Sequence, residues 1–315
     1  MTTRTAPALG RLLTAMITPF DAAGQVDLDE AARIARYLLA NGSDGLVVAG
    51  TTGESPALED DEKLALFETV KRAVGARANV VAGTGSNNTQ HSVRLTKQAE
   101  ACGVDGILAV VPYYSKPTQD GMLGHFGEIA EATRLPIIVY NIPSRTGINL
   151  QPATLLELAG RYRNIVGVKE SSGDFAQFAA ILRERRPGFS LWSGDDHLFL
   201  PALAVGGDGL ISVAAHLCGR ELREMGEAYL AGDVARAARI YLELSPIISQ
   251  LFVTTSPIPV KWAMGQLGFS VGPCRSPLGA MPASHAHILG AMLAPYQARA
   301  RETLLASYSG TSPVS

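Results

Sequence analysis

PIIVY at residues 136–140 and NIVGVK at residues 164–169 are the stretches that decide the fold. Each is a continuous apolar run without an alternating polar face, which is typical of parallel strands buried on both sides. Six more runs of this kind occur outward from them, roughly 20–35 residues apart, which suits strands joined by helices. They are Leu12–Thr18, Gly45–Ala49, Asn79–Ala82, Gly106–Val111, Phe189–Ser193 and Gly209–Val213.

Amphipathic stretches with helical spacing separate many of these runs, and Asp or Ser often precedes them, as a helix cap would. Examples are Asp29–Leu39, Glu59–Val74, Thr89–Cys102, Gln119–Thr133 and Asp174–Arg185. Eight strands, mostly each followed by a helix, predict an α/β protein of the (β/α)8 TIM barrel type. The alternative is an open doubly wound sheet, but no GxGxxG follows the first strand to support it.

About a hundred residues follow the eighth apolar run, and they have helical patterns. The predicted helices are His216–Ala231, Asp233–Phe252, Ile258–Leu267 and His285–Leu305. One helix is enough to close a barrel. We therefore expect residues 1–232 to form the catalytic barrel and residues 233–315 to form a C-terminal helical region, whose final TSPVS is frayed.

Composition excludes several classes of protein. The 315 residues carry 27 Lys and Arg against 29 Asp and Glu, which leaves no basic surface for nucleic acid or membrane. A hydrophobic fraction of 47% excludes a disordered chain. No apolar stretch approaches the ~20 residues of a membrane span, and the start lacks a signal-peptide core. Cys102, Cys218 and Cys274 form neither a disulfide framework nor a CxxC metal site, so we expect free thiols in the cytoplasm.

The active site of such a barrel lies at the carboxyl ends of the strands. Lys169 ends the run NIVGVK there. An ammonium on a buried strand loses hydration, and this favours the neutral amine that a Schiff-base nucleophile needs. The alternative is a structural ion pair with Glu170 or another carboxylate.

Polar residues follow other runs at the same end. Tyr140 ends the neighbouring run and could carry protons to and from an imine nitrogen, although it could equally be a core tyrosine. The turn Gly50–Glu54 could hold a small carboxylate with its backbone N–H groups, or simply cap a helix. Arg145 could bind a second carboxylate bidentately, or be a solvated loop arginine.

Three further motifs are weaker. Gly83–Asn87 (GTGSN) lacks the GK[ST] of a phosphate loop. Asp195-Asp196-His197 could bind a metal, but SGDD before a helix more simply indicates a cap. His285 and His287 are expected on a solvated helix face. We therefore predict no metal site.

Several motifs occur together in order: GTTGES (50–55), PYY (112–114), YNIPSRTG (140–147), VKESSGD (168–174), SGDD (193–196) and SPIPVKWA (256–263). Together they resemble the dihydrodipicolinate synthase family, within the pyruvate-dependent class I aldolase superfamily that includes N-acetylneuraminate lyase. The resemblance spans about residues 10–300 with the spacing kept. The extension of YNIP into SRTG, with Arg145, favours the synthase over the sugar-acid lyases.

The resemblance implies catalytic roles for four residues. Lys169 matches the lysine that forms an imine with pyruvate, so no separate cofactor is expected. Tyr140 matches the proton-carrying tyrosine above it. Thr51 matches a threonine that links this tyrosine to a second one, and Tyr114 matches that second tyrosine, which reaches into a neighbouring subunit's site.

It also implies three substrate-binding residues and an assembly. Thr52 matches the binder of the pyruvate carboxylate, Arg145 the binder of the carboxylate of L-aspartate 4-semialdehyde, and Ile211 a residue lining the pyruvate pocket. The product would be 4-hydroxy-tetrahydrodipicolinate, on the route to diaminopimelate and lysine, and the enzyme a homotetramer built as a dimer of dimers. The alternatives are a lyase for N-acetylneuraminate or a 2-keto-3-deoxy sugar acid, and a catalytically inactive barrel.

The sequence departs from the family where its lysine-inhibited members bind lysine. Asn87 and Tyr113 match, but His91 stands in place of the glutamate that usually holds the lysine amine. Asp60 and Lys63 occupy two positions that are often histidine. Because an anion is lost and a cation gained, we expect weak or absent inhibition by lysine.

Overall fold

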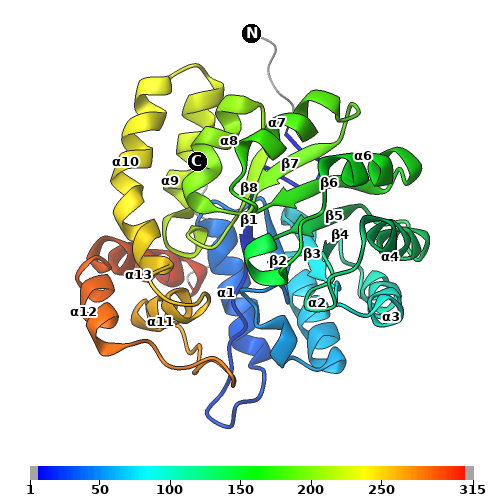
Figure 1. Ribbon diagram of the computed structural model, residues 1–315. Helices are drawn as coiled ribbons and strands as arrows, with labels where there is room; N and C mark the ends of the chain where they lie inside the picture. The colour runs from blue at the N-terminus through cyan, green and yellow to red at the C-terminus, as the bar shows by residue number, and fades with distance from the viewer. Residues whose placement is uncertain (1–5, 309–315) are drawn as a thin grey trace.

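The computed structural model describes residues 6–308, with the side chains of residues 304–308 excluded. Within that range the strands form one closed parallel barrel in the order β1 to β8 (Figure 1). The strands are β1 (Leu12–Ala15), β2 (Gly45–Val48), β3 (Asn79–Gly83), β4 (Gly106–Val110), β5 (Ile137–Asn141), β6 (Ile165–Glu170), β7 (Ser190–Ser193) and β8 (Gly209–Ser212). The predicted (β/α)8 fold is confirmed, with every predicted strand within a few residues of its observed bounds.

Helices surround the barrel because their apolar faces cover the outside of the sheet. They are α1 (Leu28–Ala40), α2 (Asp60–Val74), α3 (Thr89–Ala101), α4 (Gln119–Glu131), α5 (Pro143–Thr146), α6 (Pro152–Arg161), α7 (Phe175–Glu184), α8 (Phe199–Val205) and α9 (Ala215–Leu230). Asp27 and Asp174 begin α1 and α7 by accepting hydrogen bonds from N–H groups of the first turn. Such side-chain caps satisfy donors that have no partner within the helix.

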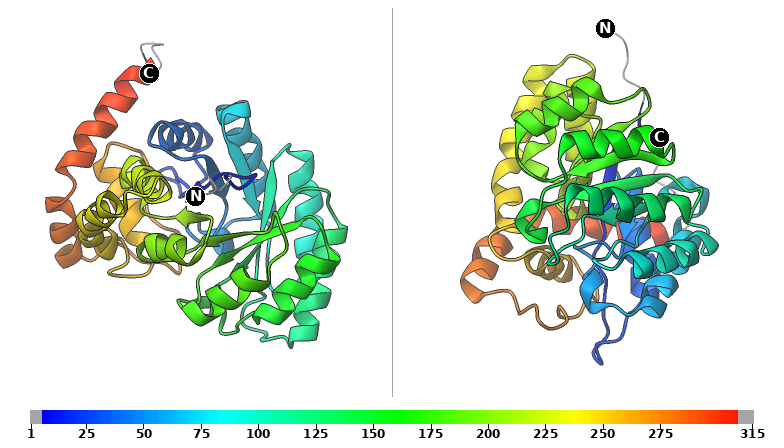
Figure 2. Two further views of the ribbon diagram at one scale, coloured as in Figure 1. Left: turned by 90° about the horizontal axis from the view of Figure 1, so that it is seen from above. Right: turned by 45° about the vertical axis from the view of Figure 1, so that its right-hand side comes forward.

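The C-terminal region packs against one side of the barrel (Figures 1 and 2). It contains α10 (Val234–Leu251), α11 (Ile258–Gln266), α12 (Ala283–Ala291) and α13 (Ala294–Tyr308). The single helix predicted over His285–Leu305 is wrong, because the chain breaks between α12 and α13. Pro295 stands in the first turn of α13, where its missing N–H group costs nothing, whereas inside one continuous helix it would remove a hydrogen bond. The predicted frayed TSPVS lies outside the described residues.

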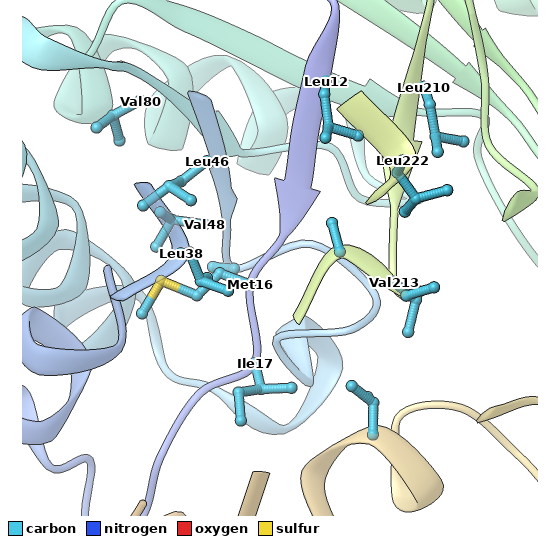
Figure 3. Close-up of a cluster of buried hydrophobic side chains, with 14 of the residues drawn as sticks. Leu12, Met16, Ile17, Leu38, Leu46, Val48, Val80, Leu210, Val213 and Leu222 are labelled. Carbon is cyan, nitrogen blue, oxygen red and sulfur yellow. The ribbon is translucent and has the colours of Figure 1, made fainter. Parts of the chain in front are cut away.

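Two apolar clusters hold the barrel together. The larger lies between strands and helices, and Figure 3 shows Leu12 of β1 and Leu210 of β8 close to Leu222 of α9. The smaller fills the barrel interior and includes Tyr140, Trp192 and Ile211. The interior of the barrel is therefore packed with side chains, which leaves the carboxyl ends of the strands as the place for a site.

Candidate active site

Lys169 lies on β6, one residue before the end of the strand, and pairs in register with Tyr140 on β5. Its side chain is 5% exposed, and its Nζ atom lies 4.2 Å from the centre of the Tyr140 ring. Within residues 6–308, the Lys169 ammonium has neither an ion pair nor a hydrogen bond with any side chain. The structure thus places a buried amine against a tyrosine ring, with no carboxylate to fix it.

Glu170 does not pair with Lys169, although it is the next residue. Adjacent strand residues face opposite sides of the sheet, so its carboxylate lies outside the barrel. There it accepts hydrogen bonds from Asn141 Nδ2 at 3.1 Å, from Gln177 Nε2 at 2.9 Å and from the backbone N–H of Ser172 at 2.7 Å. Burial raises the pKa of the Glu170 carboxyl, while these bonds act in the opposite direction. The ion-pair interpretation of Lys169 is therefore wrong.

Gly194, just after β7, gives the Lys169 side chain its space. A Cβ atom at this position would lie 2.8 Å from Lys169 Cε and closer still to Ser171 Oγ. Any larger residue at 194 would therefore displace the lysine. Gly194 belongs to the motif SGDD, but its packing role could not be predicted from sequence, because it depends on the contact between β6 and β7.

A cavity of about 240 Å³ opens at the carboxyl ends of the strands. It brings together three of the predicted site residues: Thr51 after β2, Tyr140 on β5 and Arg145 on α5. Its other walls are mostly apolar and include Leu108 and Val110 of β4. A small cavity with an apolar wall and a few convergent polar groups suits a small organic substrate.

The other four predicted residues, Lys169 among them, do not line this cavity. Thr52 is buried beside Thr51, and Ile211 is buried in the barrel interior in the same cluster as Tyr140. Tyr114 is 89% exposed and has a positive φ of 71°, so within one subunit it does not line the cavity.

The turn that carries Thr51 and Thr52 is tightly constrained. Ala49 before it and Glu54 after it both have left-handed backbone conformations, with φ of 51° and 59°. The Glu54 N–H donates to the Thr51 carbonyl at 3.1 Å, whereas in the described chain no hydrogen bond uses the N–H groups of Thr51 and Thr52. These two N–H groups and the two hydroxyls remain available to a carboxylate.

Lys261 is a second buried lysine. It belongs to the motif SPIPVKWA, but nothing in its sequence context indicated a role near the site. It lies on α11, is 1% exposed, and its Nζ atom is 2.6 Å from Glu54 Oε1. The two residues are 207 positions apart in the chain, so no local pattern could have paired them. Burial lowers the pKa of the Lys261 ammonium, and Glu54 acts against this shift.

A second cavity, of about 560 Å³, lies next to the first, and Tyr113 lines both. The five residues singled out for lysine binding all line it: Asp60, Lys63, Asn87, His91 and Tyr113. His91 Nε2 lies 2.8 Å from one Asp60 oxygen, and Lys63 Nζ lies 3.5 Å from the other. Burial alone would raise the pKa of the Asp60 carboxyl, but hydrogen bonds and charges from His91 and Lys63 lower it.

The motif Asp195-Asp196-His197 behaves as a cap. The Asp195 carboxylate accepts from the His197 N–H at 2.9 Å at the start of a 3-10 turn (Asp196–Leu198). Asp196 is buried, and it accepts from Ser212 and from the N–H groups of Val213 and Ala214. In the described residues, no group of three or more His, Cys, Asp or Glu is arranged to hold a metal. Within the same range, no helix is long and apolar enough to cross a membrane.

Comparison with known proteins gives consistent results. Residues 8–295 match the Dihydrodipicolinate synthetase family. The 4-hydroxy-tetrahydrodipicolinate synthase of Moorella thermoacetica is 57% identical over 85% of this chain and 92% of its own, and that of Symbiobacterium thermophilum is 54% identical over 86% and 92%.

Solved structures agree. The dihydrodipicolinate synthase DapA-2 of Bacillus anthracis superposes with a TM-score of 0.88 at 42% identity, covering 90% of this chain and 97% of the other. An enzyme of this kind from Cyanidioschyzon merolae, solved with lysine bound, gives 0.88 at 44% identity over 94% and 98%.

Proposed function

The chain belongs to the dihydrodipicolinate synthetase family and is a lyase with 4-hydroxy-tetrahydrodipicolinate synthase activity, and we propose that Lys169 carries the reaction. The observation that supports this most strongly is the isolation of the Lys169 amine. It is buried at the cavity end of the barrel, 4.2 Å from the Tyr140 ring, and no carboxylate of the described residues neutralises it. An amine without an ion pair can lose its proton and act as a nucleophile.

The first substrate is pyruvate. The neutral Lys169 amine attacks the pyruvate carbonyl carbon, and loss of water leaves an imine between that carbon and Nζ. Removal of a methyl proton then gives an enamine, because the imine nitrogen accepts the electron pair. We assign these proton transfers to Tyr140, because Nζ lies 4.2 Å from the centre of its ring and a phenol can carry protons. The Thr51 and Thr52 turn holds the pyruvate carboxylate, and Ile211 lines the pocket for its methyl group.

The second substrate is L-aspartate 4-semialdehyde. The enamine carbon attacks its aldehyde, and Arg145 at the cavity wall holds its carboxylate. The substrate's own amine then attacks the imine carbon and displaces Lys169. This closes the ring of 4-hydroxy-tetrahydrodipicolinate, a product on the route to diaminopimelate and lysine, and restores the free amine. The chemistry needs no cofactor beyond the covalent imine on Lys169.

We also propose a homotetramer, arranged as a dimer of dimers. Large apolar side chains are exposed on the single chain, including Tyr114 at 89%, Leu242 at 68% and Val205 at 45%. Tyr114 would enter the neighbouring subunit's site, and Thr51 would link it to Tyr140. Light scattering that gives the mass of one chain would contradict this assembly.

Two further assignments are proposals. A cytoplasmic location is supported by three cysteines, Cys102, Cys218 and Cys274, which are all free thiols. We place the boundary between the catalytic barrel and the C-terminal helical region at residues 232 and 233, where Asp233 caps α10 after a glycine. Fractionation of cells, and expression of residues 1–232 alone, test these two assignments.

The central experiment combines trapping with a product assay. The enzyme is incubated with pyruvate and borohydride, and the Lys169 peptide should gain the mass of reduced pyruvate. Pyruvate and aspartate semialdehyde should then give the cyclic product, while N-acetylneuraminate and keto-deoxy-gluconate should release no pyruvate. An unmodified Lys169 peptide would refute the mechanism, and cleavage of a sugar acid would favour the lyase alternative.

A further inference from the structure

The Glu54–Lys261 pair joins the C-terminal region to the turn that carries Thr51. Glu54 is 2% exposed and Lys261 is 1% exposed. Among the ion pairs of the described chain it is the one in which both side chains are almost completely buried. Removing two charges from water costs free energy, so stability alone does not explain why an ion pair is buried here.

Arg275 completes the anchoring of Glu54. Its backbone N–H donates to Glu54 Oε2 at 2.8 Å, so both carboxylate oxygens have partners. Its guanidinium bonds both oxygens of Glu62 on α2, at 2.7 and 2.6 Å. The Arg275 guanidinium and the Lys261 ammonium also lie over the Phe20 ring, at 4.3 and 3.9 Å. The Glu54 side chain therefore has one fixed position.

That fixed side chain belongs to a strained backbone. Glu54 has a φ of 59°, and its N–H donates to the Thr51 carbonyl at 3.1 Å. A left-handed conformation is strained for a residue other than glycine, and it persists only where its surroundings impose it. Lys261 and Arg275 supply this restraint, because they hold the side chain whose backbone closes the Thr51 turn.

The same C-terminal region also holds the other side of the cavity. Arg145 Nη2 donates to the Ser256 carbonyl at 3.2 Å, five residues before Lys261. A third, smaller cavity, of about 170 Å³, is lined by Thr51, Glu54, Arg145 and Ser256. The turn with Thr51 and the helix with Arg145 are thus both attached to one segment outside the barrel.

From this geometry we propose that Lys261 and Arg275 are positioning residues, which act through Glu54 to hold Thr51 and Thr52 in the conformation that binds the first substrate's carboxylate. The inference rests on the proposed function of Lys169. Neither residue lines the main cavity, so we assign their effect on the reaction to the turn that Glu54 closes.

The test removes both buried charges together, so that neither is left unpaired. The double variant Glu54→Gln/Lys261→Met is compared with wild type for the rate of imine formation on Lys169 and for the KM of pyruvate. The control is Arg185→Met/Asp208→Asn, which removes a part-buried pair beside the start of β8, at the opposite end of the barrel. Circular dichroism confirms that each protein is folded at the assay temperature.

We expect the Glu54/Lys261 variant to form the imine about 10- to 100-fold more slowly and to have a raised pyruvate KM. Misplacing a substrate-binding group by about 1 Å can lower the rate of a reaction by this factor. The control should lose thermal stability but keep both values within about twofold. If the Glu54/Lys261 variant loses stability and yet reacts at the wild-type rate, the pair is structural and the inference is wrong. If wild type itself forms no imine, the proposed function fails instead. Should the double variant not fold, Lys261→Arg, which keeps both charges but moves the cation, is assayed in the same way.

Discussion

Two lysines are buried in similar surroundings but have opposite electrostatic situations. Lys169 is 5% exposed and Lys261 is 1% exposed, and each ammonium lies over an aromatic ring, at 4.2 and 3.9 Å. Lys261 has the Glu54 carboxylate at 2.6 Å, whereas Lys169 has no carboxylate partner in the described part of the chain. Burial alone therefore does not distinguish the lysine that we propose to be reactive from the one paired with Glu54, whereas the presence or absence of a carboxylate partner does.

The largest expected difference comes from making the same substitution at both lysines. Lys169→Met should lower activity by at least about 10⁴-fold, because the covalent route is lost. Its free energy of unfolding should change by about 1 kcal/mol or less, since no ion pair is broken. Lys261→Met should instead cost about 3–5 kcal/mol, because it leaves Glu54 buried and unpaired. Urea unfolding and initial rates measure the two quantities.

Equal losses of stability in Lys169→Met and Lys261→Met would contradict this comparison of the two lysines. Lys71→Met is the control for removal of a lysine charge, because its pair with Asp105 is partly exposed at 24% and 29%. A partly exposed pair contributes about 0–1 kcal/mol, so this variant should resemble wild type in both assays.

The effect of burial on a basic side chain can also be measured at His216. It is fully buried, its Nε2 accepts from the Ile17 N–H at 3.2 Å, and its Nδ1 lies 2.8 Å from the Val213 carbonyl. Burial lowers the pKa of His216 to about 4. A histidine with this pKa is neutral at pH 7.

The sign of the pH effect follows from that shift. The unfolded chain binds a proton on this histidine near pH 6.5 and the folded protein only near pH 4, so its contribution is complete above 6.5 and is lost as the pH falls. Lowering the pH from 7 to 5 should therefore reduce the free energy of unfolding by about 2 kcal/mol through His216. His216→Gln should remove that part of the pH dependence. An unchanged dependence in urea titrations would contradict the assignment.

The smallest expected effect concerns Lys63, a third buried lysine, which is 6% exposed. Its Nζ is 3.5 Å from Asp60, in the wall of the second cavity. Free lysine should inhibit weakly or not at all, because this cation repels its ammonium. Lys63→Ala should tighten lysine inhibition by no more than about tenfold. Strong inhibition of wild type in initial-rate assays would overturn this expectation.

The barrel was predictable from local signals because its strands are continuous apolar runs. Runs such as PIIVY and NIVGVK report burial on both faces without reference to any partner strand. The break at Met292 and Leu293 was missed although Pro295 follows closely, because helical composition continues on both sides. The helices α11, α12 and α13, which pack outside the barrel, have a weaker periodicity of apolar residues. Their bounds therefore depend on tertiary contacts.

The sequence predicted which residues gather at one end of the barrel, while their roles stay predictions. Tyr140 and Lys169 end apolar runs and Arg145 follows one, and chain order alone brings them to the carboxyl ends of the strands. Glu54 and Lys261 were not recognised as a pair, because the partners lie on different elements and neither has a local signal of burial. Gly194 was likewise missed as a spacer, since only the packing of β7 on β6 shows which side chain it admits.

The Glu54–Lys261 contact also constrains how this sequence can change over evolutionary time. A single substitution at either position passes through a chain with one buried, unpaired charge, so the two positions should be replaced together or not at all. Chimeras that exchange the C-terminal helices with those of a relative would inherit one member of the pair from each parent. A crossover between residues 54 and 261 should then yield active enzyme only when both parents carry complementary residues at these two positions.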